Sequence, residues 1–122
     1  TYLYHSGASD DDRFGSAVAL RGDLLLVGAP GDYVGPTLTT GLAYVFERDP
    51  NGTWNETDVW IPSIIVGDDR GGAFGESLAL DERLAIVGAR AADLGGPDWD
   101  YSHGAAYVYS RDDGVTWAEE AL

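Results

Sequence analysis

The chain has 122 residues, about the length of one domain, and 44% of them are hydrophobic, which is enough for a core and excludes a disordered acidic tail. Its net charge is −14 and its seven cationic residues are all arginine, so it lacks the basic stripe that nucleic-acid binding requires. Cysteine is absent, which excludes disulfide frameworks and thiolate metal sites, and no apolar run is long enough to span a membrane.

The chain contains an internal repeat. The stretch "FGSAVALRGDLLLVGAP" (residues 14–30) returns as "FGESLALDERLAIVGAR" (residues 74–90). The pair Phe14-Gly15 returns as Phe74-Gly75. A repeat of this kind predicts one supersecondary unit that occurs twice and buries its apolar face against its neighbours.

Each copy contains four short segments that are rich in β-branched and aromatic residues and are bounded by turn residues, which predicts β-strands. In chain order these are Ser16–Leu20, Leu24–Val27, Leu42–Phe46 and a strand beginning at Trp54, then Glu76–Leu80, Leu84–Val87, Ala105–Tyr109 and a strand beginning at Trp117. Four antiparallel strands per copy predict an all-β fold of two four-stranded β-propeller-type blades, over residues 1–61 and 62–122. We expect the two recurring tryptophans to pack within the blades.

The ends of the chain predict contacts with neighbours. Two blades are too few to close a propeller, which has about four to eight. Joining Leu122 to Thr1 nearly restores the internal spacing from a tryptophan to the next Phe-Gly pair, so the chain behaves as one period cut in or after the fourth segment. We expect the blades to be completed by adjacent repeats of a longer chain or by other subunits. In a filament or ring of subunits, Tyr2, Leu3 and Tyr4 would complete a neighbour's sheet.

The pattern "FG…GDLLLVGAP…GLAYVF…W" resembles FG-GAP repeats, the blade-forming units of integrin alpha-subunit propellers and of many secreted proteins. The resemblance covers nearly the whole chain, twice, although Arg90 stands where proline is expected. It implies a propeller scaffold with Phe14 and Phe74 locking the blades, and an extracellular or cell-surface location. A scaffold alone does not specify a function.

The tripeptide Arg21-Gly22-Asp23 is one that adhesion receptors read on their ligands. It falls between two predicted strands, and the second copy has Asp81-Glu82-Arg83 there. Because a hairpin turn must occupy this position, we expect a turn, with the receptor ligand as the alternative.

Acidic clusters are the candidate metal ligands. They consist of Asp10, Asp12, Asp68, Asp69, Asp98 and Asp100. The calcium loop of integrin propellers, Asp-x-Asp-x-Asp-Gly, is absent. Solvated turn carboxylates and weak calcium sites are therefore both open readings, and no other cofactor is indicated.

Two glycosylation sequons begin at Asn51 and Asn55, on an expected exposed loop. Catalysis has little support, because no acidic residue is spaced to form a triad with His5 or His103 and the adjoining serines. We therefore expect both histidines to be polar surface residues.

The expected function is that of an extracellular, non-enzymatic structural or adhesive protein that assembles with itself, with no nucleic-acid partner and no membrane insertion. The alternative is a part of a larger propeller that binds a protein or glycan through the loops Pro30–Thr40 and Arg90–His103. In the second loop, Trp99 is the residue that could stack on a sugar ring.

Overall fold

A computed structural model describes residues 1–34, 38–63, 72–92 and 103–120 of the chain. The described residues form β-strands and loops, without a helix that is long and apolar enough to cross a membrane. The strands are β1 (Ala17–Arg21), β2 (Leu24–Ala29), β3 (Tyr33–Val34), β4 (Leu38–Thr39), β5 (Leu42–Arg48), β6 (Trp54–Trp60), β7 (Phe74–Leu80), β8 (Leu84–Ala89), β9 (Ala105–Ser110) and β10 (Ala118–Glu119).

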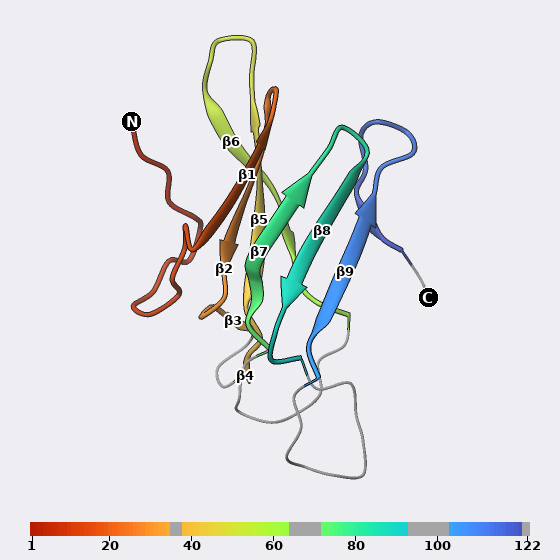
Figure 1. The fold of residues 1–122 in the computed structure, drawn as a ribbon. Coiled ribbons are helices and arrows are strands. Elements are labelled where there is room, and N and C mark those ends of the chain that lie inside the picture. Colours follow the sequence, from red (N-terminus) through yellow and green to blue (C-terminus); the bar gives the residue numbers. More distant parts are fainter. Residues whose placement is uncertain (35–37, 64–71, 93–102, 121–122) are drawn as a thin grey trace.

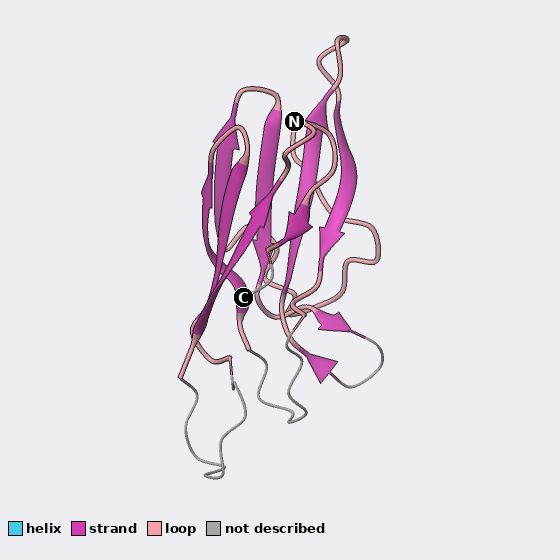
Figure 2. Ribbon diagram, turned by 90° about the vertical axis from the view of Figure 1, so that its right-hand side faces the viewer, coloured by secondary structure: helices cyan, strands magenta, loops and turns pink. Residues whose placement is uncertain are grey.

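The strands form two four-stranded antiparallel sheets, which confirms the predicted fold class. Blade 1 has the order β1-β2-β5-β6, and blade 2 has the order β7-β8-β9-β10. Figures 1 and 2 show the two sheets lying against each other with the N-terminal segment on the far side of blade 1. One detail differs from the sequence prediction. Residues 30–40 were expected to form a loop without strands, but they contain the antiparallel pair of β3 and β4.

The alternation of side chains along β5 gives the core two parts. Ala43 and Val45 face blade 2, whereas Leu42, Tyr44 and Phe46 face away from it. We call the first part the inter-blade core; it contains Leu24, Leu26, Ala43, Val45, Trp60, Phe74, Ala85, Val87, Ala89, Ala92, Tyr107 and Tyr109. We call the second part the outer cluster; it contains Val27, Ala29, Leu42, Tyr44 and Phe46, and Leu3 and Phe14 pack on it.

The backbones of the two blades touch where two glycines meet. A Cβ atom at Gly28 would lie 1.7 Å from the carbonyl oxygen of Gly75, so no larger residue fits there. Gly75 itself has a φ of +90°, a conformation that L residues rarely adopt. Beside it, Phe74 is fully buried in the inter-blade core. The Phe-Gly pair of the second repeat therefore docks on the Gly-Ala pair of the first.

We expect Gly28→Ala to lower the free energy of unfolding by about 2 kcal/mol or more, because the added methyl group meets a fixed backbone and overpacking typically costs about 1–3 kcal/mol. The matched control is Gly88→Ala, at the equivalent position of blade 2. Its Cβ would meet the hydroxyl of Ser77 at 2.0 Å, but that side chain can rotate away. Urea denaturation followed by tryptophan fluorescence measures both effects, and equal losses would contradict this account of the contact.

Candidate functional site

The two blades present the same strand positions in two different environments. In blade 1, Leu24 and Leu26 of β2 are 4% and 0% exposed, because blade 2 covers them. In blade 2, the equivalent Leu84 and Ile86 of β8 are 49% and 45% exposed. The far face of blade 2 thus repeats the face that blade 1 buries, but leaves it open.

The opposite end of the molecule shows the complementary pattern. In blade 2, Leu78 and Leu80 of β7 pack against the inter-blade core. The equivalent residues of β1 are Val18 and Leu20, and each is 64% exposed. The chain therefore exposes both halves of its own internal interface, one half on each end.

The N-terminal segment corresponds to the end of the fourth strand of a blade, as the following hydrogen bonds show. The amide and hydroxyl of Ser6 donate to the carboxylate of Glu56, with donor–oxygen distances of 3.0 and 2.6 Å. The same two groups of Ser63 donate to Glu119, which is the residue equivalent to Glu56. Ser6 thus corresponds to Ser63, and residues 2–4 correspond to residues 59–61, which end β6 and follow it.

The packing agrees with this correspondence. Trp60 stacks on Tyr109 of blade 2, with ring centroids 4.1 Å apart and ring planes 6° apart. Leu3, its counterpart, packs on the outer cluster of blade 1. The predicted assembly residues Tyr2 and Tyr4 are 86% and 73% exposed, so they are accessible to a neighbouring sheet.

Blade 2 has a short fourth strand. In blade 1, β6 pairs with β5 from Arg48 back to Ala43. In blade 2, β10 pairs only with Ser110 and Tyr109 of β9. Among the described residues, the first half of β9 has no strand of its own blade on this edge beyond the single bond from the Glu120 amide to the Val108 carbonyl.

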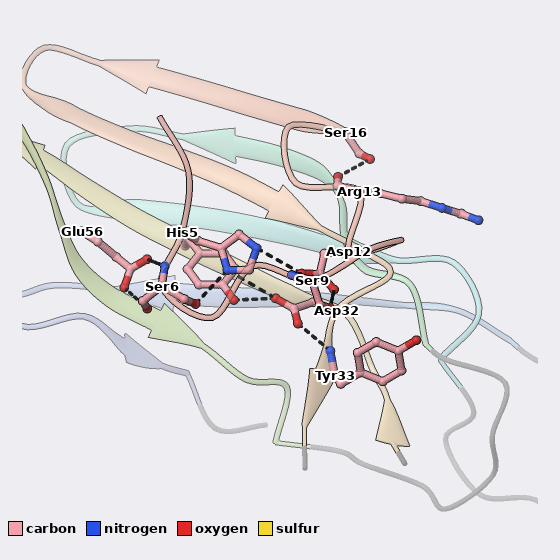
Figure 3. Close-up of polar contacts among 10 residues, drawn as sticks. His5, Ser6, Ser9, Asp12, Arg13, Ser16, Asp32, Tyr33 and Glu56 are labelled. Carbon is pink, nitrogen blue, oxygen red and sulfur yellow. Dashed lines mark hydrogen bonds and ion pairs between the residues drawn. The ribbon is translucent and has the colours of Figure 1, made fainter. Parts of the chain in front are cut away.

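A second candidate site consists of three polar side chains buried beneath the N-terminal segment (Figure 3). Nε2 of His5 lies 3.3 Å from Oδ2 of Asp12, and Nδ1 of His5 lies 3.9 Å from Oδ2 of Asp32. Each residue offers one ligand atom, and these three atoms lie within 4.8 Å of one another. Asp12 precedes the Phe-Gly pair and Asp32 follows β2, so the fold unites residues that are distant in sequence. We call this group the His5 cluster.

Hydrogen bonds hold Asp12 in its charged form. The amide and the hydroxyl of Ser9 donate to its two carboxylate oxygens over 2.6 and 2.7 Å. Burial alone would raise the pKa of Asp12, but the hydrogen bonds from Ser9 and the electrostatic effect of the nearby His5 outweigh burial and hold that pKa below its usual value. Asp12 is therefore ionised at neutral pH.

Hydrogen bonds also fix the position of Asp32, from two sides. Its carboxylate accepts the backbone amide of Tyr33 at 2.7 Å and the phenol hydroxyl of Tyr44 at 2.5 Å. Burial and the hydrogen bond to Asp32 raise the pKa of Tyr44 above its usual value, so this phenol keeps its proton and remains a donor.

His5 has one nitrogen with a hydrogen bond and one without. Nδ1 lies 3.0 Å from the carbonyl oxygen of Ser6, which can only accept, so Nδ1 carries a proton. Nε2 is buried and has no hydrogen-bond partner. The imidazole ring lies between Phe14 and Tyr44, with ring centroids 5.0 and 4.3 Å away. The ring is thus held in one orientation, with Nε2 toward Asp12 and with Nδ1 toward the Ser6 carbonyl and Asp32.

Two expectations about these residues are wrong. His5 is not a polar surface residue, because the outer cluster and the N-terminal segment bury it to 3% exposure. Asp12 is not a solvated turn carboxylate, because its chain segment folds over β2, whereas Asp10 is exposed as expected. Sequence reasoning missed Asp32, and the available signal was that "GAPGD" carries an acid that "GARAA" lacks.

The remaining candidates from the acidic clusters and the loop tryptophan lie outside the described residues. They are Asp68, Asp69, Asp98, Asp100 and Trp99. His103 lies at the start of the last described segment and is exposed.

The tripeptide Arg21-Gly22-Asp23 forms the turn between β1 and β2, as expected, with Gly22 at a φ of +58°. The carboxylate of Asp23 lies 2.8 Å from Nε of Arg48, which donates a hydrogen bond to it, and 2.7 Å from Nη2 of the same guanidinium. Arg21 pairs with Asp81 and Glu82 of the other blade at 3.7 and 3.6 Å. Both charged groups of the tripeptide are therefore engaged within the chain.

Both sequons lie at the exposed turn and strand start between β5 and β6. Asn51 is exposed, and its backbone amide donates to Asp49. The side-chain nitrogen of Asn55 lies 3.3 Å from a carboxylate oxygen of Asp49 and 3.2 Å from the carbonyl oxygen of Thr53. Both sites are accessible, and their glycosylation stays a prediction.

Comparison with known proteins adds one match. A sequence model of the FG-GAP repeat matches residues 2–46 and 65–109. The first match begins at Tyr2, so it includes the N-terminal segment in the repeating unit. No curated protein matches the chain significantly.

Proposed function

The chain belongs to the FG-GAP repeat family, and on that premise we propose that it is an extracellular, non-enzymatic structural or adhesive protein whose blades stack head to tail with those of further copies. FG-GAP repeats are typical of extracellular or surface proteins. The observation that carries the proposal is the exposure, at opposite ends, of both halves of the interface that the chain buries internally.

The two exposed faces have the chemistry of a stacking interface. Leu84 and Ile86 at one end would meet Val18 and Leu20 at the end of the next copy, as Leu24 and Leu26 meet β7 inside the chain. Burial of such side chains stabilises association by about 25 cal/mol for each Å² removed from water. Because the two faces differ, the contact is heterologous, and it gives a ring if it closes and a filament if it does not.

Strand addition would complete the contact. Residues 2–4 correspond to residues 59–61, and β6 places residues 59 and 60 opposite Tyr44 and Ala43. In a stack, Tyr2 and Leu3 of one copy would therefore lie opposite Tyr107 and Ala106 of another, next to the Ser110 and Tyr109 that pair with β10. Main-chain hydrogen bonds of this kind supply affinity, and alternate side chains supply specificity.

We expect Ile86→Lys and Leu20→Lys each to abolish self-association of the chain, because each buries a charge in one half of the contact. A mixture of the two variants should form a one-to-one dimer, since each retains the half that the other has lost. Sedimentation velocity measures all three samples. Val115→Lys, an exposed apolar position in the turn after β9, is the control that should assemble as the unmodified chain does.

Two outcomes would contradict head-to-tail stacking. A chain that stays monomeric at its highest soluble concentration has no such contact. Assembly that survives both substitutions, or a mixture that does not dimerise, would place the contact elsewhere, as expected for binding through the loops.

We also expect the self-association to strengthen as the salt concentration rises. Each copy carries a net charge of −14, so stacking brings like charges together, and salt screens that repulsion over about 8 Å at physiological ionic strength. Repeating the sedimentation measurement from low to high sodium chloride tests this. Dissociation by salt would instead indicate a contact made by ion pairs.

A further inference from the structure

We propose that His5, Asp12 and Asp32 bind one divalent transition-metal cation of the Zn²⁺ type beneath the N-terminal segment. The group was not recognised from sequence, and it consists of residues other than the apolar side chains that form the proposed stacking contact. Its three side chains are 3%, 2% and 6% exposed, so they form an interior site rather than a patch of surface carboxylates.

The first argument is charge. Two carboxylates in an apolar surrounding cost free energy unless positive charge compensates them. A divalent cation would supply that charge, and the proton that Nδ1 of His5 donates to the Ser6 carbonyl leaves Nε2 as the nitrogen that can bind it.

The second argument is the unpartnered nitrogen. Nε2 of His5 is buried without a hydrogen-bond partner and lies 3.3 Å from Oδ2 of Asp12. Bonds of about 2.0–2.2 Å to a tetrahedral ion separate neighbouring ligand atoms by roughly 3.5 Å. The spacing of these two atoms is therefore close to that of two ligands of one ion, and a carboxylate oxygen of Asp32 lies within the 4.8 Å that encloses the three possible ligand atoms.

The third argument is the outer hydrogen bonds. A histidine that binds metal usually donates its other N–H to a carbonyl or carboxylate, and ligating carboxylates accept further hydrogen bonds. His5 donates to the Ser6 carbonyl, Asp12 accepts from Ser9, and Asp32 accepts from Tyr44. All three proposed ligands are thus oriented by hydrogen bonds to neighbouring groups.

The fourth argument comes from the second repeat, which has the same backbone bonds without the three side chains. The Gly31 amide bonds to the carbonyl of Asp12 as the Ala91 amide bonds to that of Gly72, so Gly72 replaces Asp12. By the same comparison of hydrogen bonds, the other two replacements are Pro62 for His5 and Ala92 for Asp32. All three polar residues are absent together, as expected if they act together and if the fold of a blade does not need them.

The donor set selects the class of ion. Calcium and magnesium prefer sites made of oxygen ligands, whereas imidazole suits zinc and similar transition metals. The cluster offers one imidazole nitrogen and two carboxylates. We therefore expect Zn²⁺ to bind here in preference to Ca²⁺, the ion that the acidic pattern suggested for Asp12.

The test is titration of the complete, metal-free chain with Zn²⁺ and, separately, with Ca²⁺. Native mass spectrometry should show one tightly bound Zn²⁺ per chain, and the melting temperature should rise with Zn²⁺ but not with an equal concentration of Ca²⁺. The ring ¹⁵N signal of Nε2 of His5 should shift on binding while Nδ1 stays protonated.

The variants His5→Gln and Asp32→Asn should each weaken Zn²⁺ binding at least about tenfold. Asp32→Asn keeps an oxygen acceptor for one of the two donors, the Tyr33 amide or the Tyr44 hydroxyl, and circular dichroism verifies that both variants fold. The controls Asp10→Asn and His103→Gln should bind as the unmodified chain does. The proposal is overturned if no Zn²⁺ binds, if binding is undiminished in the two variants, or if Ca²⁺ binds equally well.

Discussion

The structure depends on the contact between Gly28 of blade 1 and Gly75 of blade 2. Only glycine allows the two backbones to approach so closely, and that approach brings the apolar rows of the facing sheets into register. Phe74 fills the space beside the contact and meets Tyr107 edge-on, with ring centroids 5.1 Å apart. A motif of two small residues and one large one thus specifies how each repeat is placed on the one before it. The same geometry leaves an open half-interface at each end.

The strands could be predicted from the sequence because their signals are local. Strands show alternating apolar residues, and turn residues such as Gly22 lie between them. The internal repeat also showed which segments of the two copies are equivalent. The stacking of Trp60 on Tyr109 could not be predicted, because a tryptophan that occurs in only one copy has no internal counterpart to compare with. The correspondence between residues 2–4 and the end of β6 could be predicted, because joining Leu122 to Thr1 nearly restores the internal spacing from a tryptophan to the next Phe-Gly pair.

The His5 cluster lay beyond sequence reasoning for a different reason. His5, Asp12 and Asp32 are ordinary polar residues in segments that read as an end, a turn and a loop. Their burial arises only when the N-terminal segment folds across the outer cluster, which is a tertiary event. Comparison of the two copies would have marked Asp12 and Asp32 as departures from the repeat, but not as neighbours.

The aromatic stack at the end of β6 has a mechanical consequence. Inside the chain, Trp60 lies flat on Tyr109 and meets Trp117 edge-on at 5.4 Å. At the open end, the corresponding residue is the smaller Leu3. A stack of copies would thus contain two kinds of contact between blades. The contact inside each copy has the large aromatic ring and the continuous chain, whereas the contact between copies has neither. If copies stack as proposed, we expect tension to separate the contact between copies more readily than the contact between the two blades of one copy.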